Sequence, residues 1–203
     1  MKILLKVLTI NTQIKLMEEV EKLISVSPLI QPTMPKWNKP FKTLITNAGE
    51  WGWISDKISY RYVKSHPITK KKWPKIPNIF YQIWNQFADY DKLPNCSLIN
   101  VFPDQKSKLG LHKDKDEKCF KAPVLSISLG NTAIFKYGKT KKKLQQTSLP
   151  SGSIVLLKDY SRLYYHSISK IFVEKDLVAK NNSVNLPKYT NGRVSITLRK
   201  FSI

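Results

Sequence analysis

The chain has 203 residues, with 35 Lys and Arg against 14 Asp and Glu, a net charge of +21 and a pI near 9.9. With 41% hydrophobic and 11% aromatic residues, it is not a disordered basic tail and can bury the core of a single compact unit. No apolar run approaches the roughly 18–20 residues of a membrane span, so we expect no membrane partner. Cys96 and Cys119 form neither a disulfide framework nor a zinc pattern, which favours a reducing cytoplasm.

The first half of the chain, residues 1–95, predicts two helices around an aromatic-rich segment. Residues 1–10 favour a strand rather than a signal peptide, and Asn11 or Thr12 is expected to cap a helix that ends near residue 26. Four prolines between residues 28 and 40 are expected to prevent regular structure. Residues 41–62 are strand-like, and a second helix is expected to stop near Pro94.

Beyond residue 95, short apolar segments recur between turn residues. Strands are expected at residues 97–102, 123–129, 132–137, 153–157, 163–167 and 192–202. Short strands at this spacing predict a sandwich or a jelly roll. The predicted fold class is therefore α+β and mainly β, with supporting helices in residues 1–95 and an all-β half in residues 96–203.

Three side chains suggest a metal site in the β-rich half. His112 and Asp114 are two positions apart, so on a strand they would point to the same face. Two His and one carboxylate, with open positions opposite, are the ligands of non-haem Fe(II) oxygenases. The second imidazole must come from His66 or His166, and His166 lies in the β-rich half. A His-x-Asp pair alone is more often an ordinary surface pair.

The last expected strand has one wholly polar face, formed by Arg193, Ser195, Thr197 and Arg199. Only four of the 35 cations are Arg, and two of the four lie on this face. Arg grips a carboxylate with a planar fork that Lys cannot reproduce. The strand therefore favours a dicarboxylate site beside the metal over a solvated face.

Several segments resemble the AlkB family. The motifs are NVF at 100–102, LGLHKDKDE at 109–117, APVLSISLG at 122–130, SRLYYH at 161–166 and RVSITLR at 193–199, together with TNAG at 46–49, GW at 52–53, YRY at 60–62 and KWP at 72–74. The resemblance implies a double-stranded β-helix (jelly-roll) core with a nucleotide-recognition lid in the first half. It also implies a dioxygenase that uses Fe(II), 2-oxoglutarate and O2 to remove alkyl groups from bases of the 1-methyladenine or 3-methylcytosine type, releasing formaldehyde, succinate and CO2.

The resemblance also implies a role for each candidate residue. The iron ligands, which are also the catalytic residues, would be His112, Asp114 and His166. The 2-oxoglutarate site would comprise Asn100, Phe102, Arg193, Ser195, Thr197 and Arg199. The substrate site would comprise Trp53, Tyr60, Arg61, Tyr62, Asp116 and Lys142, with Asp116 receiving the exocyclic amino group of the base. The partner would be single-stranded or duplex DNA, or RNA, that carries alkylated bases, and we expect a cytoplasmic monomer.

Two positions depart from the bacterial pattern. Phe102 stands where that pattern has tyrosine, and Ser195 where it has asparagine, so we expect weaker 2-oxoglutarate binding, with each lost hydrogen bond costing on the order of 1 kcal/mol. Lysines at 70–72 and 139–143 are expected to contact phosphates, although a Lys-rich genome would also explain their number. Two alternatives stay open: an Fe(II)/2-oxoglutarate hydroxylase that acts on RNA, protein or lipid, and a non-catalytic basic nucleic-acid-binding protein.

Overall fold

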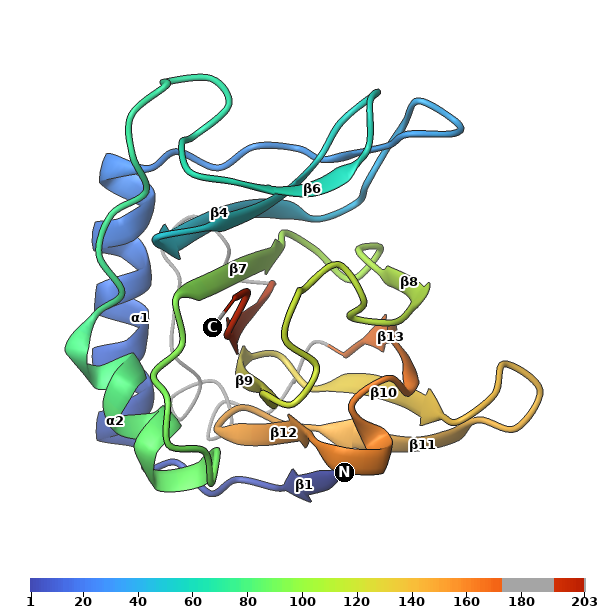
Figure 1. The fold of residues 1–203 in the computed structure, drawn as a ribbon. Coiled ribbons are helices and arrows are strands. Elements are labelled where there is room, and N and C mark those ends of the chain that lie inside the picture. Colours follow the sequence, from blue (N-terminus) through green and yellow to red (C-terminus); the bar gives the residue numbers. More distant parts are fainter. Residues whose placement is uncertain (173–191, 203) are drawn as a thin grey trace.

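The structure is a computed structural model that describes residues 1–172 and 192–202, and its core consists of two antiparallel sheets (Figure 1). The larger sheet has the order β1 (Lys2–Leu4), β12 (Ser153–Leu157), β9 (Val124–Gly130), β14 (Arg193–Arg199), β7 (Cys96–Phe102) and β4 (Leu44–Gly49). The smaller sheet has the order β11 (Gln145–Leu149), β10 (Ala133–Gly138), β13 (Tyr165–Ile171) and β8 (Leu109–His112). The jelly-roll class predicted from the sequence is confirmed.

Two helices, α1 (Ile10–Val26) and α2 (Asn78–Phe87), cover the outer face of the larger sheet (Figure 1). The cap of α1 is Thr9, whose side chain accepts a hydrogen bond from the backbone nitrogen of Thr12 at 3.2 Å, so the helix begins before the expected cap. Side chains from both helices and from the sheet form one apolar cluster, which includes Leu16, Val20, Phe80, Trp84, Ile99, Ile127 and Val194. No helix among the described residues is long and apolar enough to span a bilayer.

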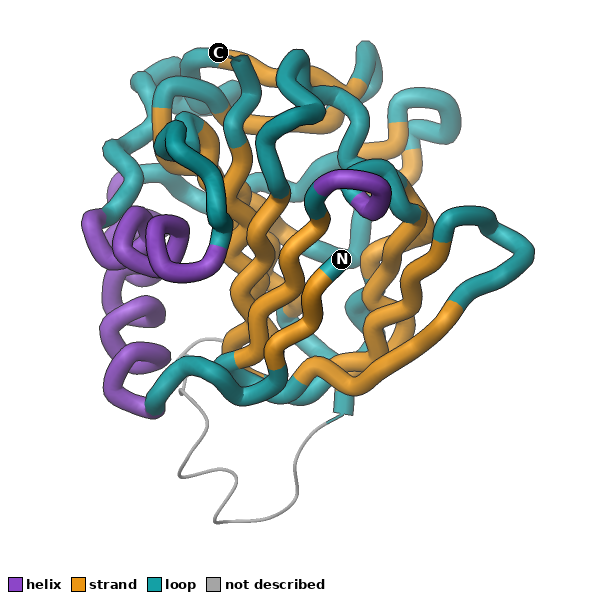
Figure 2. The backbone as a smooth tube through the Cα atoms, turned by 60° about the horizontal axis from the view of Figure 1, so that its bottom comes forward, coloured by secondary structure: helices purple, strands orange, loops and turns teal. Residues whose placement is uncertain are grey.

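The two faces of β14 have opposite environments. Val194, Ile196 and Leu198 are fully buried in the cluster beneath the helices. The alternate residues of the strand point between the two sheets, which stack as Figure 2 shows. The predicted polar face is therefore not a solvated surface but part of the interior of the sandwich. A second apolar cluster lies between the sheets and includes Phe102, Val124, Phe135, Val155 and Ile168.

Two short hairpins lie beyond β4 at the edge of the larger sheet (Figure 1). They are β2 (Thr33–Met34) with β3 (Lys39–Pro40), and β5 (Gly52–Ser55) with β6 (Tyr60–Val63). The first hairpin corrects the expectation that the proline-rich segment has no regular structure. Pro40 is tolerated there because the two-residue strand needs few ladder hydrogen bonds from it.

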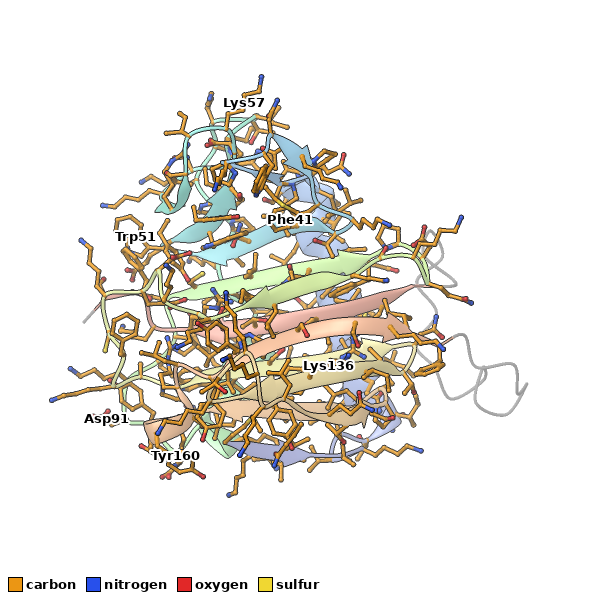
Figure 3. The ribbon with its side chains drawn as sticks, turned by 90° about the vertical axis from the view of Figure 1, so that its right-hand side faces the viewer. Phe41, Trp51, Lys57, Asp91, Lys136 and Tyr160 are labelled. Carbon is orange, nitrogen blue, oxygen red and sulfur yellow. The ribbon has the colours of Figure 1, made fainter. Side chains whose placement is uncertain are left out.

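Several strand boundaries differ from the sequence predictions. Strand structure within residues 1–10 is limited to β1, the expected strand at 163–167 lies instead at Tyr165–Ile171, and β8 and β11 were not predicted. A single-turn helix, η1 (Asp159–Ser161), precedes β13. β1 and β4 belong to the same sheet as strands from the second half, so residues 1–95 contribute directly to the core. Figure 3 shows the side formed by the smaller sheet, with Lys136 among its side chains.

Candidate active site

The three expected metal ligands meet at one end of the smaller sheet. His112 ends β8 and lies opposite His166 in the register of β13. The Nε2 atoms of His112 and His166 lie 3.8 and 3.7 Å from the two carboxylate oxygens of Asp114, and the three potential ligand atoms lie within 4.8 Å of one another. Asp114 follows the end of β8 instead of lying on a strand, so the convergence depends on the turn of this loop and not on strand alternation.

Both histidines are oriented by backbone carbonyls. The Nδ1 atom of His112 lies 2.8 Å from the oxygen of Gly110, and that of His166 lies 3.1 Å from the oxygen of Tyr164. An Nδ1–H that donates to a carbonyl leaves the Nε2 lone pair free for a metal. Burial, and then the neighbouring His112, lower the pKa of His166 to about 4, so its ring is neutral. The donor set therefore fits a divalent metal such as Fe(II).

The other histidine, His66, lies in a different part of the molecule. Its Nε2 atom is 2.9 Å from the carbonyl oxygen of Pro28, and its ring packs edge-on against Trp73. It is 2% exposed, so its environment is that of a satisfied core histidine. This leaves His166 as the second imidazole ligand among the described residues.

Asp114 is held as a carboxylate by an arginine. Arg199 Nη2 donates to Asp114 Oδ1 at 2.8 Å, and both side chains are buried. Burial by itself would raise the pKa of Asp114, but Arg199 and the two histidines outweigh it and lower the pKa below its ordinary value. The ligand is therefore ionised and fixed in orientation before a metal binds.

Glu117 connects this site to the lid, a role that the sequence interpretation missed. Its side chain is fully buried and accepts hydrogen bonds from Tyr62 Oη at 2.6 Å, Arg199 Nη1 at 3.0 Å and Arg162 Nη2 at 3.2 Å. Arg162 also donates to the backbone oxygen of Asp114 at 2.7 Å. The rarity of arginine, which singled out Arg193 and Arg199, applied equally to Arg162 and was the available signal.

Arg193 is a buried cation without a carboxylate partner among the described residues. Its guanidinium donates to the backbone oxygens of Asn131 and Leu149, both at 3.0 Å, and to Ser128 Oγ at 2.5 Å. Its Nε atom is buried and has no hydrogen-bond partner, and burial lowers its pKa to about 10. Because an unpaired buried charge is costly, this cation fits an anionic ligand such as 2-oxoglutarate.

The other residues expected at the 2-oxoglutarate site line the same interior. Ser195 lies opposite Asn100 in the β14–β7 register, and Phe102 lies opposite Arg193. Phe102 is fully buried in the apolar cluster between the sheets, so its ring contributes apolar contacts to the site and no hydrogen bond. Two serines of β9 that were not predicted at this site also line it. Ser126 Oγ lies 2.9 Å from Ser195 Oγ and 3.5 Å from Thr197 Oγ1, and Ser128 contacts Arg193 as described above.

The lid meets the metal-ligand loop through Trp53. Its indole Nε1 donates to Asp116 Oδ2 at 2.9 Å, and its ring stacks on Tyr60 with centroids 5.8 Å apart and an interplanar angle of 13°. Tyr60 is 45% exposed, whereas Tyr62 is 9% exposed and bonded to Glu117. Trp53 and Tyr60 thus offer aromatic surface near Asp116. Tyr62 instead fastens the lid, because its ring and hydroxyl are both engaged.

The two basic residues expected to contact substrate have other surroundings. Arg61 forms a bidentate pair with Asp56 inside the lid hairpin, with nitrogen–oxygen distances of 2.7 and 2.5 Å. Lys142 lies in the exposed loop between β10 and β11. Two other lysines approach the ring of Tyr165, the residue before His166. The Nζ atom of Lys141 lies 5.5 Å from the ring centroid, and that of Lys113 lies 4.3 Å from it.

Comparisons with known proteins agree with this geometry. The family model described as the 2OG-Fe(II) oxygenase superfamily matches residues 1–199. The alpha-ketoglutarate-dependent dioxygenase AlkB homolog of Caulobacter vibrioides (strain NA1000 / CB15N) is 34% identical over 166 residues, which are 81% of this chain and 71% of that protein. The AlkB dioxygenase of Escherichia coli (strain K12) is 33% identical over 175 residues, covering 83% of this chain and 80% of that protein.

A solved structure supports the same assignment. The structure of OsALKBH1 superposes with a TM-score of 0.78 at 26% identity, covering 98% of this chain and 95% of that one. Its coverage includes both sheets and the helices that support them. The two-histidine, one-carboxylate centre and the buried Arg193, which has no carboxylate partner among the described residues, agree with the Fe(II) and 2-oxoglutarate of the matching family. The chain belongs to the AlkB family within the 2OG-Fe(II) oxygenase superfamily.

Proposed function

We propose that this protein removes alkyl groups from nucleic-acid bases by oxidation, which is direct-reversal repair when the substrate is DNA. The observation that carries the proposal is the contact between Trp53 and Asp116. It places an aromatic surface and a hydrogen-bond acceptor two residues from the metal ligand Asp114. A flipped base needs both features, because its faces stack and its edge pairs with polar groups.

Bound Fe(II) and 2-oxoglutarate would supply the oxidation of the alkyl carbon by O2, with succinate, CO2 and formaldehyde as products. His112, Asp114 and His166 would hold the metal, and Arg193 would neutralise a 2-oxoglutarate carboxylate. Arg199 already donates hydrogen bonds to Asp114 and Glu117. It would keep these contacts while it helps to hold 2-oxoglutarate. The serine and threonine hydroxyls of β14 lie on the same interior face as Arg193, where they can accept or donate a hydrogen bond.

The lid residues would position the base. Asp116 uses only Oδ2 for Trp53 among the described residues, so Oδ1 can accept a hydrogen bond from an exocyclic amino group. The stacked pair of Trp53 and Tyr60 would present one ring face to the base, and His112 would flank the base from the metal side. Tyr62 would act indirectly, because its hydroxyl fixes the lid to Glu117. Arg61 and Lys142 remain proposed contacts to the phosphates around the target nucleotide.

Alkyl groups on the pairing edge weaken base pairing, which lowers the free energy needed to move the base out of the helix. In a single strand no pairing has to be broken, so this free energy is lower still. We therefore place single-stranded DNA or RNA before duplex DNA as the partner. The proposal includes a cytoplasmic monomer, consistent with the two free, buried cysteines. Size-exclusion chromatography with light scattering tests the monomer, and a dimer mass would contradict it.

The central experiment measures formaldehyde released from oligonucleotides by protein reconstituted with Fe(II), 2-oxoglutarate and ascorbate. Separate arms contain 1-methyladenine and 3-methylcytosine in single-stranded DNA, duplex DNA and RNA. A further arm contains N6-methyladenine, because the similar ALKBH1D of Arabidopsis thaliana is named a DNA N(6)-methyladenine demethylase.

We expect release from the first two bases and none from the His112→Ala variant. Asp116→Ala is expected to raise KM and lower kcat for the methylated base, while 2-oxoglutarate affinity stays unchanged. Activity that survives in His112→Ala, or no activity with any methylated nucleic acid, would refute the proposal. In that case a protein or lipid hydroxylase, or a non-catalytic binding protein, would be the better assignment.

A further inference from the structure

A basic hollow of about 410 Å³ lies at the end of the smaller sheet opposite the metal ligands. The described residues that line it are Lys42, Gln105, Lys106, Lys108, Ser169 and Lys170. Four of them are lysines and none is acidic. Lys22 and Lys158 are the lysines that form ion pairs with carboxylates in the described part of the chain, so no described carboxylate pairs with the four lining lysines.

Asp104, the carboxylate next to Lys106 in the sequence, forms no ion pair with a lining lysine in the described part of the chain. Asp104 accepts hydrogen bonds from the backbone nitrogen of Lys106 at 2.8 Å and from Ser107 Oγ at 2.9 Å, so it shapes the loop between β7 and β8. Like charges that converge on a concave surface repel one another and raise the local concentration of anions. The hollow is therefore suited to a polyanion.

An exposed tryptophan lies on the hairpin that leads to this hollow. Trp37, in the turn between β2 and β3, is 69% exposed, and Lys36 Nζ lies 4.8 Å from its ring centroid. The turn is ordered, because Trp37 and Asn38 donate backbone hydrogen bonds to the oxygen of Met34 at 3.2 and 2.8 Å. The hairpin is also tied to the lid, since Ser55 Oγ donates to the oxygen of Thr33. Residues 22–49 contain no Asp or Glu.

The hollow is a short chain distance from both the tryptophan and the metal site. Lys42 comes five residues after Trp37, so the two are at most about 18 Å apart. Lys108 precedes β8, and four residues of extended strand, about 13 Å, separate it from the ligand His112. Phe41, next to Lys42, is labelled above the strands of the smaller sheet in the view of Figure 3.

We propose that the β2–β3 hairpin and the basic hollow bind the single-stranded nucleic acid that flanks the target nucleotide. The phosphates lie against Lys42, Lys106, Lys108 and Lys170, and an unpaired base stacks on Trp37. Aromatic platforms beside a basic groove are the usual means of binding single strands without sequence preference. The identity of the ligand rests on the proposed function, whereas the surface itself rests on the exposure of Trp37 and on the unpaired lysines.

The test compares the binding of an unmodified, fluorescently labelled 20-nucleotide single strand by anisotropy, which does not depend on iron. Trp37→Ala is expected to weaken binding at least about five-fold. The double variant Lys106→Gln/Lys108→Gln is expected to reduce the slope of log affinity against log salt by about 1.4, since each phosphate contact contributes about 0.7 on single strands. The matched control is Lys15→Gln/Lys22→Gln on α1, which covers the opposite sheet and should leave the slope nearly unchanged.

Three results would overturn the proposal. If the α1 control loses as much affinity as Lys106→Gln/Lys108→Gln, binding reflects only the bulk charge of +21. If Trp37→Ala binds as the unaltered protein does, no base stacks there. If a 20-base-pair duplex binds as tightly as the single strand, stacking is again excluded, because paired bases do not offer their faces.

Activity assays separate this proposal from the proposed function. A methylated trinucleotide carries little flanking strand, so on this substrate all three variants are expected to retain the kcat/KM of the unaltered protein. On a methylated 20-mer, Trp37→Ala and Lys106→Gln/Lys108→Gln are expected to raise KM while kcat stays constant. Binding that follows the prediction in a protein inactive on every substrate would refute the function and keep the surface. Full activity of the protein, together with variants that bind the single strand as the unaltered protein does, would refute the surface and keep the function.

Discussion

Replacement of Glu117 by glutamine tests whether the buried network holds the lid and the metal site together. The substitution keeps the side-chain volume but removes the charge shared by Arg162, Arg199 and Tyr62. Breaking a buried ion pair typically costs about 3–5 kcal/mol. We expect the low end, about 3 kcal/mol, because one amide oxygen can still accept a hydrogen bond and Arg199 keeps Asp114.

For a chain of this size, each kcal/mol lowers Tm by about 2–4 °C, so Glu117→Gln is expected to lower Tm by about 6–12 °C. Metal affinity is expected to fall about 10- to 100-fold, because Arg199 and Arg162 position Asp114. Scanning calorimetry of metal-free protein and a competitive Fe(II) titration measure the two effects separately.

The matched control is Asp56→Asn, which removes the same charge from an exposed pair. Arg61 and Asp56 have side chains that are 34% and 39% exposed, so the loss is expected to be no more than about 1 kcal/mol. The hydrogen bond from Arg61 lowers the pKa of Asp56 strongly, yet solvent screening limits what this adds to stability. If Glu117→Gln and Asp56→Asn lower Tm equally, the buried network does not carry the energy assigned to it.

Four further predictions concern the metal and 2-oxoglutarate residues and the two cysteines. Asp114→Asn is expected to abolish tight Fe(II) binding in a competitive chelator titration, and retained affinity would exclude Asp114 as a ligand. Arg193→Lys is expected to weaken 2-oxoglutarate binding at least about ten-fold by calorimetry, because Lys lacks the planar fork, whereas Ser195→Asn is expected to strengthen it about five-fold. Cys96 and Cys119 are both buried and burial raises the pKa of Cys96 to about 12, so neither thiol should react with Ellman's reagent at pH 8 before unfolding; rapid labelling of the native protein would contradict their burial.

Much of the catalytic centre could be predicted because its signals are local. The spacing of His112 and Asp114, and the polar face of residues 193–199, are visible within a few residues. Scarcity made them informative, since a Lys-rich chain that places two of its four arginines on one strand face has a specific use for them. The strand argument for Asp114 was nevertheless wrong in detail, because β8 ends at His112 and the loop brings the carboxylate back.

The network around Glu117 could not be predicted in the same way. Its partners are 55, 82 and 45 residues away in the chain, at Tyr62, Arg199 and Arg162. No local pattern connects these positions, because their proximity depends on how the lid hairpin folds over the core. The role of Tyr62 could not be predicted for the same reason. Its aromatic ring suggested base stacking, but the ring is buried, which indicates that Tyr62 fastens the lid.

By itself, the sequence determined the chemistry of this protein: the ligand types, the paired arginines and the excess of lysine that suits a polyanionic partner. Only the tertiary structure decided that the polar face of β14 is also interior, because that depends on the second sheet that covers it. It also decided which cations remain available. Arg61, Arg162 and Arg199 pair with carboxylates, while Arg193 and the lysines of the hollow have no carboxylate partner among the described residues. A charge is free to bind a ligand only where folding brings no counter-charge to it.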